Sequence, residues 1–135
     1  MKKTAFALVA FILLAFTLPS CKKEKSFADQ LVGHWHSTEV KADGVDATAF
    51  YEFQMHLESS KEFDLDFITK NILSGTRSTV SYSGDWAENS DKRDLTLTYT
   101  TGETRTYEVK SLSEDTLSVE FIEGGKRFAI VFARQ

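Results

Sequence analysis

The feature that most constrains the fold is an alternation of apolar and polar residues, repeated in short runs along the chain. Residues 51–58 read YEFQMHLE, in which every odd position is apolar and every even position is polar. The same pattern returns at 63–67 and 95–100, and Phe128, Ile130 and Phe132 continue the spacing of two with large apolar side chains. A period of two is typical of a β-strand with one buried face and one wet face. Apart from one short helical turn expected at 27–32, the pattern predicts an antiparallel all-β fold.

Turn residues separate these runs and set the number of strands. The candidate turns are 42–46, 58–61, 71–76, 89–94, 101–103, 111–116 and Gly124-Gly125. Seven turns join eight strands, and each connection is short enough for a strand to pair with the one before it. Eight such strands can close on themselves and leave no exposed edge. We therefore expect an eight-stranded antiparallel up-and-down barrel over residues 27–135, wide enough for side chains or one small ligand.

The first twenty residues have the pattern of a signal peptide. Lys2 and Lys3 precede residues 5–18, an uncharged and largely apolar stretch too short to span a bilayer, which needs about 20 residues. Leu18-Pro19-Ser20-Cys21 follows and resembles the lipobox of bacterial lipoproteins. In those proteins the cysteine is acylated and becomes the new N-terminus. The resemblance implies a signal peptide over 1–20, a lipidated tether over 21–26, and anchoring to a membrane through Cys21.

Composition and the residue after the cysteine narrow the setting further. An aspartate directly after the acylated cysteine would resemble an inner-membrane retention signal, and this chain has Lys22 at that position. We therefore expect an outer-membrane lipoprotein that faces either the periplasm or the outside. The net charge of −4 and the absence of a basic cluster argue against a nucleic-acid partner. A single cysteine excludes an internal disulfide. We expect a monomer with no cofactor.

A glycine and a tryptophan open the first expected strand, in Gly33-His34-Trp35. With Arg134 near the end of the last strand, they resemble the G-x-W motif and the basic partner of lipocalins, in particular the small lipocalin-like lipoproteins of Gram-negative bacteria. The resemblance implies that Trp35 plugs one end of the barrel and that Arg134 packs on its ring. The alternative is an ordinary core tryptophan with a solvated arginine.

No motif in the chain indicates an enzyme. The sequence has no G-x-S-x-G, no phosphate-binding glycine loop and no cofactor fingerprint. Glu62, Asp64 and Asp66 are carboxylates of the kind used in glycoside hydrolysis, but alternation puts them on the wet face of their strand.

Three histidines resemble a zinc ligand set. His34 and His36 share one strand face, and a hairpin centred near residue 45 would bring His56 opposite His34. A zinc site also needs groups that orient the rings, and the nearest acids in sequence, Glu39 and Glu58, cannot be shown to reach them. We expect no structural zinc and no metal site.

The apolar faces carry many aromatic residues, which leaves two interpretations of the barrel interior. They are Tyr51, Phe53, Phe63, Phe67, Tyr82, Trp86, Tyr99, Tyr107, Phe121, Phe128 and Phe132. Either they fill a solid barrel that serves as an interaction or structural module of the envelope, or some of them line a site for a small apolar ligand. A cavity above about 300 Å³ would favour the ligand. Such a ligand is expected to enter opposite Trp35 and to contact Tyr51, Phe53, Phe67, Tyr82 and Tyr99.

Overall fold

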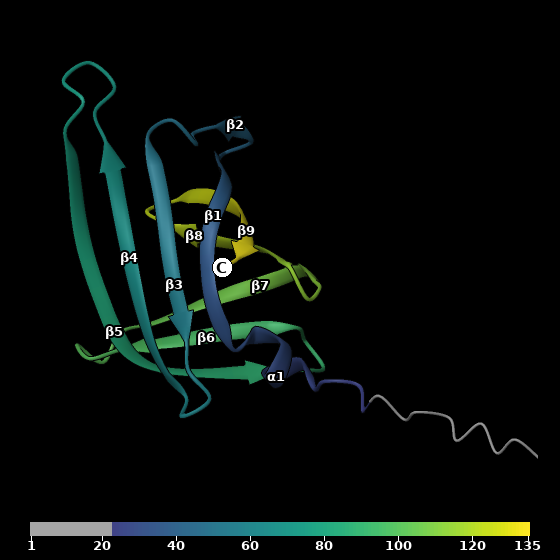
Figure 1. Ribbon diagram of the computed structural model, residues 1–135. Coiled ribbons are helices and arrows are strands. Elements are labelled where there is room, and N and C mark those ends of the chain that lie inside the picture. The colour runs from purple at the N-terminus through teal and green to yellow at the C-terminus, as the bar shows by residue number, and fades with distance from the viewer. Residues whose placement is uncertain (1–22) are drawn as a thin grey trace, which may run out of the picture.

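The computed structural model describes residues 23–135, so the predicted signal peptide and Cys21 lie outside the described residues. The described part contains one short helix and nine strands (Figure 1). They are α1 (Phe27–Leu31), β1 (Gly33–Ala42), β2 (Val45–Asp46), β3 (Tyr51–Leu57), β4 (Glu62–Lys70), β5 (Arg77–Asn89), β6 (Asp94–Tyr99), β7 (Thr104–Leu112), β8 (Thr116–Glu123) and β9 (Lys126–Arg134). Within the same residues, no helix is long and apolar enough to cross a membrane.

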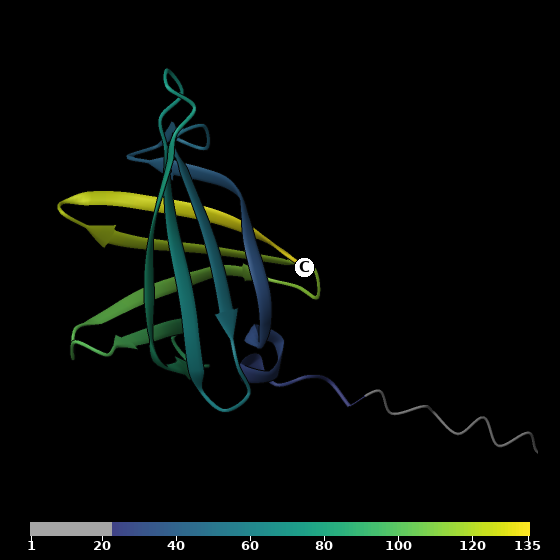
Figure 2. The same ribbon diagram turned by 60° about the vertical axis from the view of Figure 1, so that its left-hand side comes forward.

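Eight of the strands form the barrel that the alternation predicted. Their order is β1-β3-β4-β5-β6-β7-β8-β9, every neighbouring pair is antiparallel, and β9 pairs back onto β1. Figure 2 shows the strands from the side, with the β8–β9 hairpin crossing behind β3 and β4. The all-β, up-and-down, eight-stranded prediction is confirmed.

The ninth strand is a departure from the expected loop over 42–46. Asp43 and Gly44 take positive φ angles of 50° and 79°, which suit a two-residue hairpin turn. The turn folds β2 back on the end of β1, with Lys41 opposite Asp46. The segment after β2 is held against β1, because the hydroxyl oxygen of Thr48 accepts a hydrogen bond from the amide of Val40 at 3.0 Å.

β1 closes the barrel by pairing with different neighbours at different points. Its first residues pair with β3 as far as His36, and its pairing with β9 shifts register between Ser37 and Glu39. Such a bulge bends a strand and increases its twist. Ser37 is buried at the bend, where its hydroxyl oxygen accepts a hydrogen bond from the amide of Phe53 at 2.8 Å. This bond satisfies a β3 amide that has no ladder partner on β1.

A second bend lies in β5, at a glycine that the alternation did not single out. The first part of β5 pairs with β4 and the last part with β6, and the strand curves between them (Figure 1). Gly84 sits at the change with φ +156°, and a Cβ there would lie 2.0 Å from the carbonyl oxygen of Thr98. Only glycine allows this close approach of the two strands.

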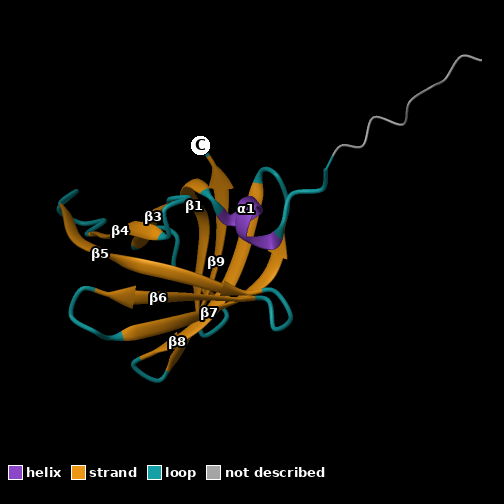
Figure 3. Cartoon of the chain, turned by 90° about the horizontal axis from the view of Figure 1, so that it is seen from below, coloured by secondary structure: helices purple, strands orange, loops and turns teal. Residues whose placement is uncertain are grey.

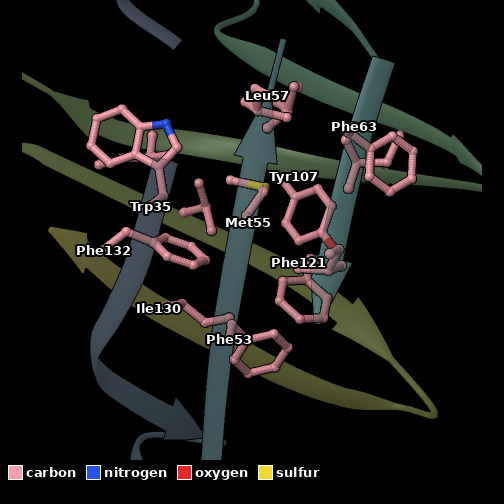
Figure 4. Packing of buried hydrophobic residues seen from close by; sticks show 14 of the residues in the cluster. Trp35, Phe53, Met55, Leu57, Phe63, Tyr107, Phe121, Ile130 and Phe132 are labelled. Atoms are coloured by element: carbon pink, nitrogen blue, oxygen red, sulfur yellow. The ribbon is translucent and has the colours of Figure 1, made fainter. Parts of the chain in front are cut away.

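The core fills the end of the barrel that α1 covers. Ser26 caps the helix, because its hydroxyl oxygen accepts a hydrogen bond from the amide of Asp29 at 3.1 Å. Leu31, the last residue of the helix, is fully buried in the core. Figure 3 looks onto this end, with α1 beside β1, and Figure 4 shows the packed side chains. The largest fully buried ones are Trp35, Phe63, Phe132, Leu31, Leu57, Leu95, Leu97, Leu117, Ile130, Val40 and Val119.

At the other end the β4–β5 hairpin extends beyond the other strands (Figures 1 and 2). The first part of β5 is only partly covered there. Val80 and Tyr82 have the inward parity of Trp86, yet they are 47% and 40% exposed. β6 pairs with β5 only from Gly84 onward, so Val80 and Tyr82 have a paired strand on the β4 side alone. The barrel is thus closed at one end and open at the other.

Candidate functional site

The open end of the barrel holds a cavity of about 470 Å³. Its position, at the ends of the strands away from α1, is the one at which a ligand was expected to enter. The residues around it are Tyr51, Phe53, Leu65, Phe67, Thr69, Tyr82, Arg105, Glu123, Gly124, Lys126 and Phe128. Four of the five sequence-predicted ligand residues are among them. The fifth, Tyr99, lies behind Tyr82 with its ring centroid 5.3 Å away.

Five of the eleven residues around the cavity are aromatic. Tyr51 stacks on Phe67 with 5.6 Å between centroids, and Phe53 packs against the same ring at 4.9 Å. On the facing side Phe128 stacks on Phe121 at 5.2 Å. Period-two alternation turns these rings inward from β3, β4, β8 and β9, and each ring holds its neighbour in place. The wall is therefore apolar, with Tyr51 and Tyr82 adding hydroxyls that suit a half-wet position.

Three charged residues on the β7 and β8–β9 side of the cavity were missed by the sequence analysis: Arg105, Glu123 and Lys126. Arg105 donates a hydrogen bond to Glu123, and its guanidinium carbon lies 5.6 Å from the Tyr99 ring centroid and 5.4 Å from that of Phe121. Parity could have identified Arg105, because it is two residues before Tyr107 and four before Val109 and therefore points to the same inward side of β7.

Two tyrosine hydroxyls beside Arg105 are buried without a hydrogen-bond partner among the described residues, those of Tyr99 and Tyr107. Burial raises the pKa of the Tyr107 hydroxyl far above its usual range and raises that of Tyr99 as well. Both therefore remain neutral at physiological pH. The cavity thus combines aromatic side chains with three charged residues on one side, and the two neutral tyrosine hydroxyls lie beside Arg105.

The opposite end is closed by the predicted tryptophan and arginine. The guanidinium carbon of Arg134 lies 4.2 Å from the ring centroid of Trp35, and the indole N–H donates to the carbonyl of Leu31 at 2.8 Å. Arg134 also donates to the carbonyls of Val32 (2.6 Å) and Gln30 (2.7 Å), and to that of Glu114. The alternative of a solvated arginine is wrong, because every donor nitrogen of the guanidinium is bound.

Gly33 makes this arrangement possible. A Cβ at residue 33 would lie 2.2 Å from Nη1 of Arg134, and its φ of +145° is one that other residues rarely adopt. The glycine, the tryptophan and the terminal arginine are thus parts of one closure. A family model described as a lipocalin-like domain matches residues 31–119. The chain belongs to the lipocalin-like domain family. The resemblance stated from the sequence is confirmed.

Solved lipocalin structures have the same architecture. Bovine odorant-binding protein in complex with a selenium-containing odorant matches with a TM-score of 0.50 and 15% identity, over 83% of this chain and 74% of that chain. The siderocalin Ex-FABP, described as functioning through dual ligand specificities, matches with a TM-score of 0.50 and 12% identity, over 78% and 74%. At these identities the likeness shows the fold alone. No curated protein sequence matches the chain.

The histidines lie on the outer face of this lipocalin-like barrel. His34 pairs opposite His56, as the hairpin arithmetic predicted, and the two rings stack with centroids 3.7 Å apart. His36 is 3.6 Å from a carboxylate oxygen of Glu52, on the same outer face. Asp64 is exposed on the neighbouring strand β4, in line with its expected place on the wet face.

Proposed function

We propose that this lipocalin-like protein binds one small, predominantly apolar ligand in the open-end cavity and acts as a binding protein rather than an enzyme. The observation that carries the proposal is the cavity itself. Its volume of about 470 Å³ is within the range of small-molecule sites, about 300–1,000 Å³. Its aromatic walls present ring faces to a ligand, and the packed α1 end prevents the ligand from passing through the barrel.

The interior thus combines the two arrangements considered from the sequence. The half beneath α1 is solid, with Trp35, Phe63 and Phe132 at most 2% exposed. The half beyond Phe53 is hollow. Support from the same fold comes from bovine odorant-binding protein, whose structure contains a selenium-containing odorant. A barrel that was only a structural module would gain from filling the hollow, because an unfilled apolar cavity forfeits packing contacts.

The proposal includes a lipid anchor at Cys21 and a place in the cell envelope as an outer-membrane lipoprotein. It rests on the lipobox resemblance of Leu18 to Cys21. Residues 23–26, which would form the rest of the tether, are exposed and have no helix or strand before α1. Because the tether leads into the closed end, anchoring would leave the mouth of the cavity pointing away from the point of attachment (Figure 1).

Native mass spectrometry of the purified protein tests the ligand function. The wild type is expected to carry a small molecule that is released on denaturation. Thr69→Trp, which places a large ring in the cavity, should lose this molecule. Thr98→Trp is the matched control, because Thr98 is exposed on β6, and it should keep the molecule. Absence of any bound molecule in the wild type would favour the alternative, a barrel that acts as an interaction or structural module.

A further inference from the structure

A row of potential metal ligands crosses three strands on the outside of the barrel, on the far side of the wall from the cavity. His34 on β1 is the direct partner of His56 on β3, and His56 is the direct partner of Asp64 on β4. Directly opposite residues on one sheet face have Cβ atoms about 4.5–5.5 Å apart. The two imidazole rings are stacked nearly parallel, 12° apart in plane. The sheet thus holds two ring nitrogens and a carboxylate side by side.

Glu58 adds a fourth group from the end of β3. One of its carboxylate oxygens lies 3.8 Å from Nδ1 of His56. Ligand atoms of His56, Glu58 and Asp64 all lie within 4.8 Å of one another. Two ligands about 2.0 Å from a tetrahedral ion are about 3.3 Å apart. Small rotations of these half-exposed or exposed side chains would therefore bring the atoms to coordinating distance. A hollow of about 160 Å³ lies over His34, His56 and Asp64, with His36 and Asp66 also at its edge. Glu58 lies outside this hollow and approaches the row at His56.

We propose that His34, His56, Glu58 and Asp64 bind one divalent ion of the zinc type on the outer face. The donor set selects the class of ion. Imidazole nitrogen with carboxylate oxygen suits zinc and its late first-row neighbours, whereas magnesium and calcium prefer all-oxygen sites. The proposal is independent of the ligand cavity, because these side chains point away from the barrel interior.

The neighbouring groups define the limits of the site. His36 faces Glu52 rather than the row, and Glu39 is paired with Lys41 at 2.8 Å. Of the two acids considered from the sequence, Glu58 reaches His56 and Glu39 does not. The pairing of β3 with β4 adds Asp64, which was not considered as a ligand. The ion would be exchangeable, because β1, β3 and β4 are already joined by backbone pairing. The fold therefore does not depend on it, and the proposal departs from the sequence-based expectation of no metal site.

Calorimetry with zinc chloride tests the site. The protein should carry Cys21→Ser, which removes its single thiol as an alternative ligand. We expect saturable binding of one zinc ion and none of magnesium. His56→Gln and Asp64→Asn should each weaken zinc binding about tenfold or more, as loss of a ligand does. His36→Gln is the matched control, a histidine on the same face outside the row, and should change the affinity less than about twofold.

Three results would overturn the proposal. They are the absence of saturable zinc binding, unchanged affinity in His56→Gln and Asp64→Asn, and an equal loss in His36→Gln. Circular dichroism of each variant establishes that the barrel is folded. Thermal unfolding gives a second readout: zinc should raise the midpoint of the wild type by mass action but not that of Asp64→Asn. Metal-free wild type should unfold at the same temperature before and after treatment with a chelator.

Discussion

Arg134, at the end of the last strand, lies over the ring of Trp35 at the start of the first, with 4.2 Å between the guanidinium carbon and the ring centroid. The two residues are also direct partners in the β1–β9 ladder. The same guanidinium binds carbonyls just before β1 and in the β7–β8 turn. One side chain thus joins both ends of the barrel sequence and fixes the closed end.

Truncation of Trp35 should be the more costly change at this closure. Trp35 is 1% exposed, so Trp35→Ala is expected to lower the free energy of unfolding by about 3–5 kcal/mol. Arg134→Ala should cost less, about 1–3 kcal/mol, from lost hydrogen bonds and stem packing. Urea unfolding measures both. Arg127→Ala is the control, since that arginine pairs with Glu120 on the surface. A loss as small for Trp35→Ala as for the control would contradict the assigned role.

Gly33→Ala should act through Arg134. The added methyl group would lie 2.2 Å from Nη1 of Arg134, which is too close, so the guanidinium must move away from the Trp35 ring. We expect a loss of about 1–3 kcal/mol, part of it from the positive φ. In an Arg134→Ala background the same substitution should cost less, and a double-mutant cycle measures the difference. Strict additivity of the two changes would show that Gly33 serves only the backbone.

Glu52 should make stability depend on acid pH. It is buried on the outer face, where Gln54 donates to it at 3.0 Å and Arg77 pairs with it. The Gln54 hydrogen bond, together with the charge of Arg77, outweighs the effect of burial and holds the pKa of Glu52 below its usual 4.5. A lowered folded-state pKa contributes stability that is present above the usual pKa and is lost as pH falls through the lower one.

Glu52→Gln should therefore cost about 1–2 kcal/mol at pH 7, and the difference from wild type should shrink as the pH falls through the lowered pKa of Glu52. Urea unfolding across pH 3–7 measures this effect. Glu108→Gln provides the control, because Glu108 pairs with Lys110 in an exposed position and should have little effect at any pH. If the difference in free energy of unfolding between wild type and Glu52→Gln stayed constant down to pH 3, the charge of Glu52 would not be the cause of that difference.

The lipid anchor is tested in cells. Because Cys21 follows a signal-peptide pattern and resembles the acylated cysteine of lipoproteins, Cys21→Ser should shift the protein from the membrane fraction to the soluble fraction. Fractionation with immunodetection measures the shift. Ser26→Ala, a change at the other end of the expected tether, is the control and should stay with the membrane. Membrane association that is unchanged in Cys21→Ser would refute the anchor.

The sequence predicted what local alternation and turns determine. Period two identified the strands, short connections implied pairing in order, and the hairpin centre placed His34 opposite His56. The Gly33–Trp35–Arg134 closure followed from parity together with a family resemblance. These features depend on neighbours in sequence or on one pairing rule applied throughout the chain.

Features that depend on contacts between distant strands were not predicted. The bend at Gly84 exists because the carbonyl of Thr98 approaches it, and nothing near residue 84 signals that contact. Arg105 lies inside the mouth because the aromatic rings of β6 and β8 support its guanidinium. The exposure of Tyr82 reflects how far the β4–β5 hairpin extends past its neighbours. The contact at Gly84 and the exposure of Tyr82 require the relative stagger of strands, which alternation does not contain, whereas the parity of β7 could have indicated that Arg105 points inward.

The central claim, a ligand site at the open end and a solid barrel at the other, is tested most directly by titrating an environment-sensitive apolar fluorescent probe into the Cys21→Ser protein. We expect saturable binding to the wild type. Tyr51→Ala and Phe67→Ala, at the cavity, should weaken it about tenfold, because each removes a ring from the wall. Phe132→Leu, at the packed end, should lower stability but leave probe affinity within about twofold. Equal loss from all three variants, or no saturable binding to the wild type, would contradict the account.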